Sequence, residues 1–210
     1  MDTREAYNQW AAQYDINENR TRDLEGIALR ESLSNISFGN CLEIGCGTGK
    51  NTAWLIEKAT HITCVDFSEE MLSRARLKIR TNQVEFIQAD IRTAWTFNKR
   101  LFDLVIFSLV LEHIGDLDHV FREAAMALSE GGYVYIGELH PFKQYMGTKA
   151  RFDTGNGMEM PECFVHHISD FIQAAKKFGL ELADLDEYFD DNDRSGIPRL
   201  LKIIFQKHSG

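Results

Sequence analysis

The residues with the clearest chemical potential lie in one short stretch, LEIGCGTGKNT, at positions 42–52. Three glycines alternate there, Gly45, Gly47 and Gly49, directly after a short apolar run. Glycine has no Cβ, so a glycine loop lets the backbone pass close to a ligand. The stretch therefore predicts a ligand-binding loop at the end of a buried strand.

Three kinds of nucleotide loop are candidates for this stretch. A phosphate-binding loop needs G-x-x-x-x-G-K-[ST], but Ile44 stands at the first glycine position and Asn51 at the last position. A dinucleotide loop needs G-x-G-x-x-G, and Lys50 stands at its third glycine. This mismatch weakens a nicotinamide-dependent oxidoreductase but leaves it as an alternative. The third pattern, E-x-G-x-G-x-G, fits fully, and the carboxylate of Glu43 suits a ligand with an ammonium group.

A second candidate group follows 21 residues after Gly45, in CVDFSEEML. Asp66 ends a predicted strand there, and a carboxylate in this place can accept hydrogen bonds from both hydroxyls of a ribose. Its neighbours Phe67 and Met71 are suited to pack against an adenine ring. The two stretches together predict a nucleoside-containing ligand.

With these motifs, the chain resembles class I S-adenosylmethionine-dependent methyltransferases of the ubiquinone and biotin synthesis type. IQADI, FDLVIFSLVLEHI and LSEGGYVYIGELHPF follow in the family's order, and the resemblance covers about residues 36–207. It implies S-adenosylmethionine as cofactor, S-adenosylhomocysteine as product, and methyl transfer. The cofactor-binding residues that it implies are Glu43, Gly45, Cys46, Gly47, Asp66, Phe67, Met71, Asp90, Ile91, Ser108 and Tyr14.

Methyl transfer from a sulfonium requires alignment, and it requires a base only where the nucleophile carries a proton. His113, just beyond the fourth predicted strand, is the nearest candidate for that base, and His140 is the second candidate catalytic residue. No His-x-x-x-His spacing occurs, so no metal site is expected.

Residues 139–167 form a long insertion, and long loops in compact domains often bind substrates. The insertion contains aromatic residues together with Lys143, Lys149 and Arg151. We expect it to cover a small, partly aromatic acceptor that carries a carboxylate or phenolate.

The absence of certain motifs narrows the range of possible methyl acceptors further. The segment after the fourth strand has no [DN]-P-P-[YFW] motif, no Pro-Cys pair occurs, and the net charge of -9 disfavours nucleic acid. A small-molecule acceptor is therefore expected. A cofactor-binding regulatory protein without catalysis and a protein-side-chain methyltransferase remain as alternatives.

The elements that must position these residues alternate between strand and helix. Strands are expected at 41–44, 62–65, 84–88, 102–107 and 133–138. Helices are expected over 4–34, where Asn17–Asn19 interrupt two helical runs, over 51–58 and 117–128, and also after an N-cap at Ser68. A helix capped by Ser169 and a hairpin of residues 180–189 and 200–206 follow. This predicts an α/β fold, a Rossmann-like seven-stranded mostly parallel sheet with helices on both faces and a C-terminal antiparallel hairpin.

We expect one methyltransferase domain over residues 1–210, divided into an N-terminal helical cap (1–35), a cofactor-binding core (36–139), a substrate-cap insertion (139–167) and a C-terminal helix and hairpin (168–207). No run of about 18 apolar residues occurs, and the first ten residues contain no apolar core. We therefore expect a cytoplasmic protein without a membrane partner. The oligomeric state stays open.

Overall fold

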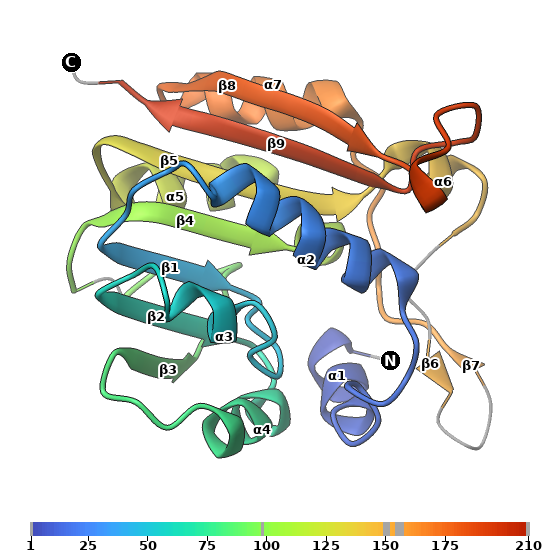
Figure 1. Ribbon diagram of the computed structural model, residues 1–210, viewed down its shortest axis with the longest axis horizontal. Helices are drawn as coiled ribbons and strands as arrows, with labels where there is room; N and C mark the ends of the chain where they lie inside the picture. The colour runs from blue at the N-terminus through green and yellow to red at the C-terminus, as the bar shows by residue number, and fades with distance from the viewer. Residues whose placement is uncertain (1, 98, 149–151, 154–157, 209–210) are drawn as a thin grey trace.

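The computed structural model describes residues 2–97, 99–148, 152–153 and 158–208, and a seven-stranded sheet runs through it (Figure 1). Its strand order is β3-β2-β1-β4-β5-β9-β8. Neighbours among β1 to β5 pair in parallel, whereas β9 is antiparallel to both β5 and β8. The bounds are β1 Asn40–Ile44, β2 His61–Asp66, β3 Val84–Gln88, β4 Phe102–Ser108, β5 Leu128–Leu139, β8 Leu180–Tyr188 and β9 Leu200–Lys207. The predicted fold is confirmed.

Helices cover both faces of the sheet (Figure 1). On one face, α5 (Leu117–Ala127) and α7 (Ile168–Lys177) bury an apolar cluster that includes Phe121 and Phe171. On the other face, α2 (Arg20–Leu33), α3 (Thr52–Leu55) and α4 (Glu69–Lys78) cover a second cluster. The central strands are apolar on both faces because both faces are covered.

The strand order reverses between β1 and β4, which places a crevice at the carboxyl ends of these two strands. Ile44 of β1 pairs with Val65 of β2 and with Phe107 of β4. The three strands therefore end at one level, and the loops that follow them meet there.

Three element boundaries differ from the sequence-based expectation. The helix expected over 51–58 is α3, which ends at Leu55, and hydrogen-bonded turns lead on to β2. The helix expected after Ser169 begins at Ile168, because His167 is the N-cap and its backbone N–H donates to Asp170 Oδ2 at 2.8 Å. Ser68, by contrast, caps α4 as predicted, accepting from the N–H of Met71 at 3.2 Å.

The start of β5 is the third difference. The strand begins at Leu128, directly after α5, and not at Tyr133. Gly131 and Gly132 lie inside it, where the register with β4 shifts. Gly131 has a φ of 76°, so the glycine pair forms a bulge rather than a turn before the strand.

The remaining short elements lie around the carboxyl ends of the parallel strands. They are α1 (Thr3–Trp10), α6 (Pro141–Tyr145) and the two-residue strands β6 (Phe152–Asp153) and β7 (Met158–Glu159) (Figure 1). Of the two helices in the expected N-terminal cap, α1 lies at this end, whereas most of α2 packs along β5 and β9. Within the described ranges, no helix combines the length and apolar character needed to cross a membrane.

Candidate active site

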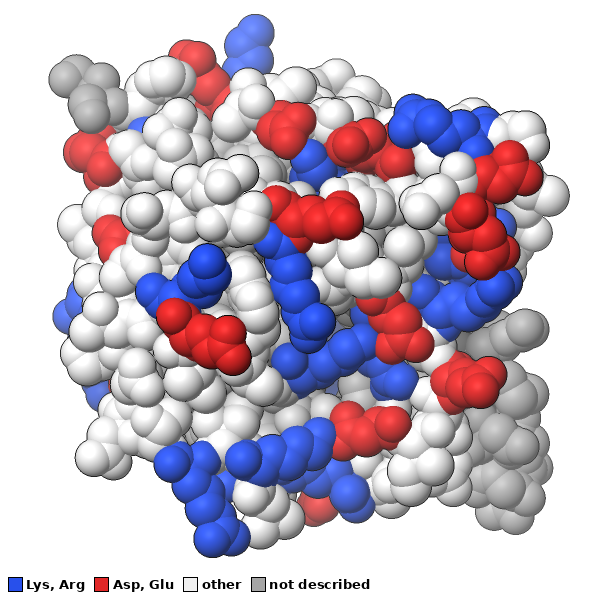
Figure 2. All heavy atoms as spheres, viewed as in Figure 1, with Lys and Arg blue, Asp and Glu red and all other residues white. Residues whose placement is uncertain are grey.

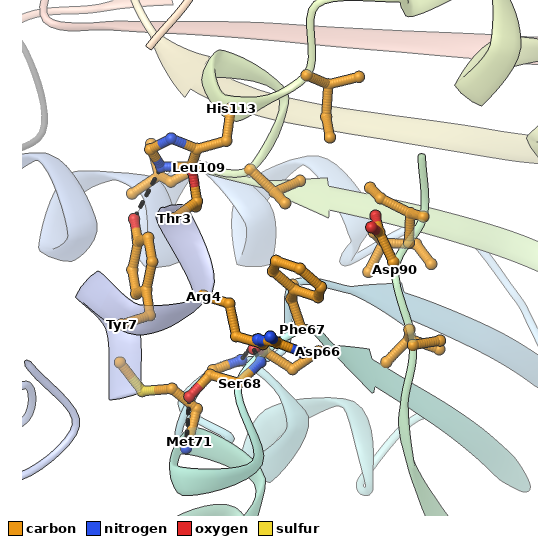
Figure 3. Close-up of a pocket in the computed structure, with 18 of the residues that line it drawn as sticks. Thr3, Arg4, Tyr7, Asp66, Phe67, Ser68, Met71, Asp90, Leu109 and His113 are labelled. Atoms are coloured by element: carbon orange, nitrogen blue, oxygen red, sulfur yellow. Dashed lines mark hydrogen bonds between the residues drawn. The ribbon is translucent and has the colours of Figure 1, made fainter. Parts of the chain in front are cut away.

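A cleft that is partly open to solvent lies at the carboxyl ends of β1, β2, β3 and β4. The loops after these strands form its floor, and residues of α1 form one wall (Figure 3). Ten of the expected site residues line it, namely Tyr14, Gly45, Gly47, Asp66, Phe67, Met71, Asp90, Ile91, Ser108 and His113. Residues from 14 to 113 in the sequence thus share one cavity.

The glycine loop forms the tightest part of the cleft. Gly45 and Gly47 have φ angles of 70° and 54°, in the left-handed region that favours glycine. A Cβ on Gly45 would lie 2.9 Å from the side chain of Val110. The third glycine serves packing, since a Cβ on Gly49 would lie 2.7 Å from Ile79.

Asp66 sits at the end of β2, directly beside this loop. Its Oδ2 accepts from the N–H of Gly47 and its Oδ1 from the N–H of Ser68, both at 2.8 Å (Figure 3). Burial raises the pKa of Asp66, although these N–H donors act in the opposite direction. Each carboxylate oxygen has two lone pairs, so both retain a place for a ligand hydroxyl.

Cations surround Phe67 at another part of the cleft. The guanidinium groups of Arg4 and Arg92 lie 5.3 and 4.9 Å from the centre of the Phe67 ring. Arg92 also forms an ion pair with Asp90 at 2.9 Å. Partial burial raises the pKa of Asp90, but the hydrogen bonds from Arg92 dominate and lower it. In this structure the carboxylate of Asp90 therefore faces Arg92.

His113 lies at the far end of the cleft, in the short η1 turn Leu111–His113. Its Nδ1 is 2.8 Å from the carbonyl oxygen of Glu162, and its Nε2 is 2.9 Å from the hydroxyl of Tyr7. A carbonyl oxygen only accepts, so Nδ1 carries the hydrogen and Nε2 accepts from Tyr7. Nε2 is thus the ring nitrogen that faces α1 and the cleft.

The turn that carries His113 is held from β5. Glu138 Oε1 accepts from the N–H groups of Val110 and Leu111 at 2.9 and 2.8 Å. Leu109, before them, has a φ of 54°, which is unusual for a residue with a side chain. Burial raises the pKa of Glu138 to about 8.

Ser108 and Tyr14 complete the lining. Ser108 Oγ is 3.1 Å from Asn51 Nδ2, a buried amide that also donates to Glu25. The Tyr14 ring packs 4.9 Å from the ring of Trp10 and 4.9 Å from the guanidinium of Arg22. Tyr14 therefore joins the wall of the cleft that the N-terminal segment provides.

Glu43 and Cys46 are expected site residues that do not line the cleft. Glu43 points to the opposite face of β1 from Leu42 and Ile44, and its Oε2 accepts from Thr52 Oγ1 at 2.6 Å. Burial raises its pKa to about 7. Cys46 is also buried, in the apolar cluster beneath α2 and α3. Strand alternation explains why Glu43 lies under the glycine loop and not in the cleft.

His140 also lies away from the cleft. It is fully buried as the N-cap of α6, where Nδ1 accepts from the N–H of Phe142 at 3.2 Å. Its Nε2 lies 2.9 Å from Glu187 of β8. Burial lowers the pKa of His140. These contacts describe a structural histidine.

The insertion contributes to the site in a different way from that expected. Lys143 lies 3.8 Å from Asp190, and Lys149 and Arg151 lie outside the described residues. The N–H of Phe164 donates to the carbonyl oxygen of Glu112 at 2.7 Å. Together with the Glu162 contact, this supports the turn that carries His113.

The sequence predicts an N-terminal helical cap, but it does not indicate which residues of α1 enter the cleft. Thr3, Arg4 and Tyr7 line the cleft, and Arg4 and Tyr7 are three residues apart, so they share one helix face. The helical spacing of Tyr7 and Trp10 is a signal for this face, but it does not show what the face covers. No three or more His, Cys, Asp or Glu side chains in the described ranges are placed to hold a metal ion.

The residues present fit a nucleoside cofactor with an amino-acid tail. The glycine loop gives a cradle that a Cβ would fill, Asp66 gives a carboxylate for a diol, and Phe67 with Met71 and Ile91 gives an apolar surface for a base.

Comparison with known proteins agrees with this fit. The family described as a methyltransferase domain matches residues 42–136. An uncharacterized methyltransferase of Emericella nidulans is 26% identical over 228 residues, covering 89% of this chain and 78% of the relative. A malonyl-[acyl-carrier protein] O-methyltransferase of Haemophilus ducreyi is 31% identical over 163 residues, covering 74% of this chain and 58% of the relative. This chain thus spans little more than half of the second relative.

Solved structures give the same answer for the fold. The structure described as a DhpI complex with SAH has a TM-score of 0.77 and 24% identity, and covers 98% of this chain and 95% of that one. A putative S-adenosylmethionine-dependent methyltransferase from Listeria monocytogenes has a TM-score of 0.74 and 19% identity, with 88% and 98% covered. By its cleft, its fold and these relatives, the chain belongs to the class I S-adenosylmethionine-dependent methyltransferases.

Proposed function

We propose that this protein transfers the methyl group of S-adenosylmethionine to a small-molecule acceptor. One observation carries the proposal: the glycine loop and the half-buried Asp66 carboxylate meet at the carboxyl ends of β1 and β2, inside one cleft. Gly45 and Gly47 would hold the amino-acid part of the cofactor, and Asp66 its ribose. When bound, the cofactor supplies a methyl group on a positively charged sulfur, which is open to in-line displacement.

The chain's own residues would orient the reactants and handle a proton. Phe67, Met71 and Ile91 would enclose the adenine. His113 Nε2 is the group placed to accept a proton from the acceptor, because Nδ1 is committed to the Glu162 carbonyl.

Several observations favour a small acceptor. The site is a cleft with α1 against it, and not an open face. On the face seen in Figure 2, Lys and Arg side chains are interspersed with Asp and Glu, which suits a nucleic-acid backbone poorly. Two relatives are named as a ubiquinone biosynthesis O-methyltransferase and a malonyl-[acyl-carrier protein] O-methyltransferase. These names describe the acceptors of those relatives, and the acceptor of this protein is not taken from them.

The first test is ligand binding. Thermal unfolding and calorimetry with S-adenosylmethionine, S-adenosylhomocysteine, NAD, NADP and ATP should show stabilisation by the two sulfur compounds alone. A ligand at about 100 times its Kd stabilises by about 2.7 kcal/mol. Stabilisation by NAD or NADP instead would support the oxidoreductase alternative, and cofactor binding without turnover on any acceptor would support the regulatory alternative.

The residue test is Asp66→Asn, which keeps the shape of the side chain but removes its charge. We expect at least a tenfold weaker affinity for S-adenosylhomocysteine, because hydrogen bonds to charged groups contribute about 1.5–3 kcal/mol. Asp118→Asn is the matched control, since Asp118 is a surface carboxylate paired with Lys177. Unchanged affinity in Asp66→Asn would remove Asp66 from the cofactor site.

A further inference from the structure

The far end of the cleft contains a phenol that belongs to the protein itself. The hydroxyl of Tyr7, on α1, lies 2.9 Å from His113 Nε2, and the two rings meet edge to face with centroids 5.4 Å apart (Figure 3). Both residues line the cleft. Both ring nitrogens of His113 thus have a partner, Nδ1 the Glu162 carbonyl and Nε2 the Tyr7 hydroxyl.

The position of the donor is set by α1 and not by the sheet. Tyr7 packs against Trp10 and Tyr14, with ring centroids 5.7 and 6.5 Å away. Ala6 and Trp10 form a small buried cluster separate from the two clusters that flank the sheet. Movement of α1 would therefore withdraw the Tyr7 hydroxyl and leave Nε2 open, without disturbing the main core.

The charged groups near His113 determine which kind of ligand group could bind to Nε2 once the Tyr7 hydroxyl has moved away. Glu112 Oε1 lies 3.9 Å from His113 Nε2, and Glu112 Oε2 is buried without a hydrogen-bond partner in the described ranges. Cys163 Sγ is 3.8 Å from Nδ1. The cations that line the cleft, Arg4 and Arg92, both lie at Phe67. A carboxylate at His113 would thus meet another carboxylate and a nitrogen lone pair.

We propose that the reacting group of the acceptor is a phenolic hydroxyl that takes the place of the Tyr7 hydroxyl on His113 Nε2. Tyr7 is then a specificity-determining residue. Its hydroxyl occupies a position that favours an uncharged O–H donor, beside the rings of Trp10 and Tyr14. This inference rests on the proposed function. Of the two acceptor groups expected from the sequence, a carboxylate and a phenolate, it selects the second, in its uncharged form before reaction.

The step balances without a further reactant. The acceptor O–H bond breaks, and its proton moves to His113 Nε2. The oxygen forms the new bond to the methyl carbon, and the electron pair of the broken S–CH3 bond stays on sulfur. Glu112, 3.9 Å away, stabilises the positive charge that His113 gains. The products are a methyl ether and neutral S-adenosylhomocysteine, and the imidazolium then releases its proton to solvent.

The test measures binding of three simple probes to the protein saturated with S-adenosylhomocysteine. Phenol, benzylamine and benzoate are titrated separately while the His113 ring signals are followed by NMR, with assignment from their loss in His113→Gln. We expect phenol to shift the His113 signals and to bind most tightly. In Tyr7→Phe the competing hydroxyl is absent, so phenol should bind about two- to tenfold more tightly than in the wild type.

Tyr188→Phe is the matched control, because the Tyr188 hydroxyl also donates one hydrogen bond, to Glu31 at 3.1 Å on the surface. Its phenol affinity should equal that of the wild type. Unchanged or weaker phenol binding in Tyr7→Phe would overturn the proposal, as would tighter binding of benzoate or benzylamine than of phenol. Failure of S-adenosylhomocysteine to bind would instead overturn the proposed function, and calorimetry detects this before any probe is added.

Discussion

At the scale of single residues, Gly45 is a position where the cofactor loop tolerates little change. It combines a φ of 70° with a Cβ position only 2.9 Å from Val110, a residue of the turn that leads to His113. Alanine there would meet both backbone strain and a side-chain clash. The residue thus links the conformation of the glycine loop to that of the turn after β4.

Gly45→Ala should lower the free energy of unfolding by about 1–3 kcal/mol, the usual cost of a residue held in a sparsely populated backbone region. It should also weaken binding of S-adenosylhomocysteine. Urea denaturation and calorimetry measure the two effects. Gly196→Ala is the control, because its Cβ would meet its nearest atom at an ordinary 3.5 Å. Equal stability of the two variants would contradict the role given to Gly45.

At the scale of elements, the turn after β4 depends on β5. Glu138 supplies the acceptor for two backbone N–H groups of that turn, and it is buried with its pKa raised to about 8. The folded protein therefore keeps a proton on Glu138 that the unfolded chain, with an ordinary pKa of 4.5, releases. Because the unfolded state binds fewer protons, the free energy of unfolding falls as pH rises between these two values.

Glu138→Gln should remove this part of the pH dependence, since glutamine keeps an acceptor oxygen but does not titrate. The stability of the variant relative to the wild type should increase from pH 5 to pH 8, as measured by urea denaturation at each pH. Glu43, whose pKa is raised to about 7, acts in the same direction and remains in both proteins. Glu57→Gln changes an exposed residue and is the control. Its free energy of unfolding, plotted against pH, should be parallel to that of the wild type. A parallel curve for Glu138→Gln would show that Glu138 is not protonated in the fold.

At the scale of the whole molecule, the segment formed by α1 and the turns that follow it, residues 3–16, is attached to the cofactor loops and not to the core. Asn8 accepts from Ser68 Oγ at 2.6 Å, Asp15 from Thr48 Oγ1 at 2.6 Å, and Tyr7 donates to His113. These three hydrogen bonds reach Ser68 after β2, Thr48 after β1 and His113 after β4, so each of the three loops is contacted once. Such polar contacts at the surface of the sheet contribute far less than the burial of a core strand.

Hydrogen exchange should show this difference directly. Amides of α1 should exchange through local opening, much faster than those of β4, because regions with few buried apolar contacts open at low free energy. S-adenosylhomocysteine should slow exchange in α1 while amides of α5, on the far side of the sheet, change little. If α1 without ligand were as protected as β4, then α1 would be part of the core and not a cover.

The sequence by itself determined the fold class, the order of strands and helices, and the region of the cofactor loop. These follow from local signals: apolar runs of strand length, glycines at alternate positions, an N-cap at Ser68 and a carboxylate at the end of β2. Such signals depend on residues near each other in the chain, so they can be read without the fold. Where a boundary depended on packing, as at the start of β5 and of α7, the sequence-based bounds were wrong.

The tertiary structure alone decided which side chains face one another. Strand alternation buries Glu43 beneath the loop, and the contact with Glu187 of β8 holds His140 outside the cleft. The pairing of Tyr7 with His113 joins residues 106 positions apart, and Leu109 adopts a positive φ that no sequence signal indicates. These features arise from long-range contacts whose energies depend on the assembled sheet. For that reason the sequence predicts the cofactor loop, whereas only the fold shows how the other end of the cleft is built.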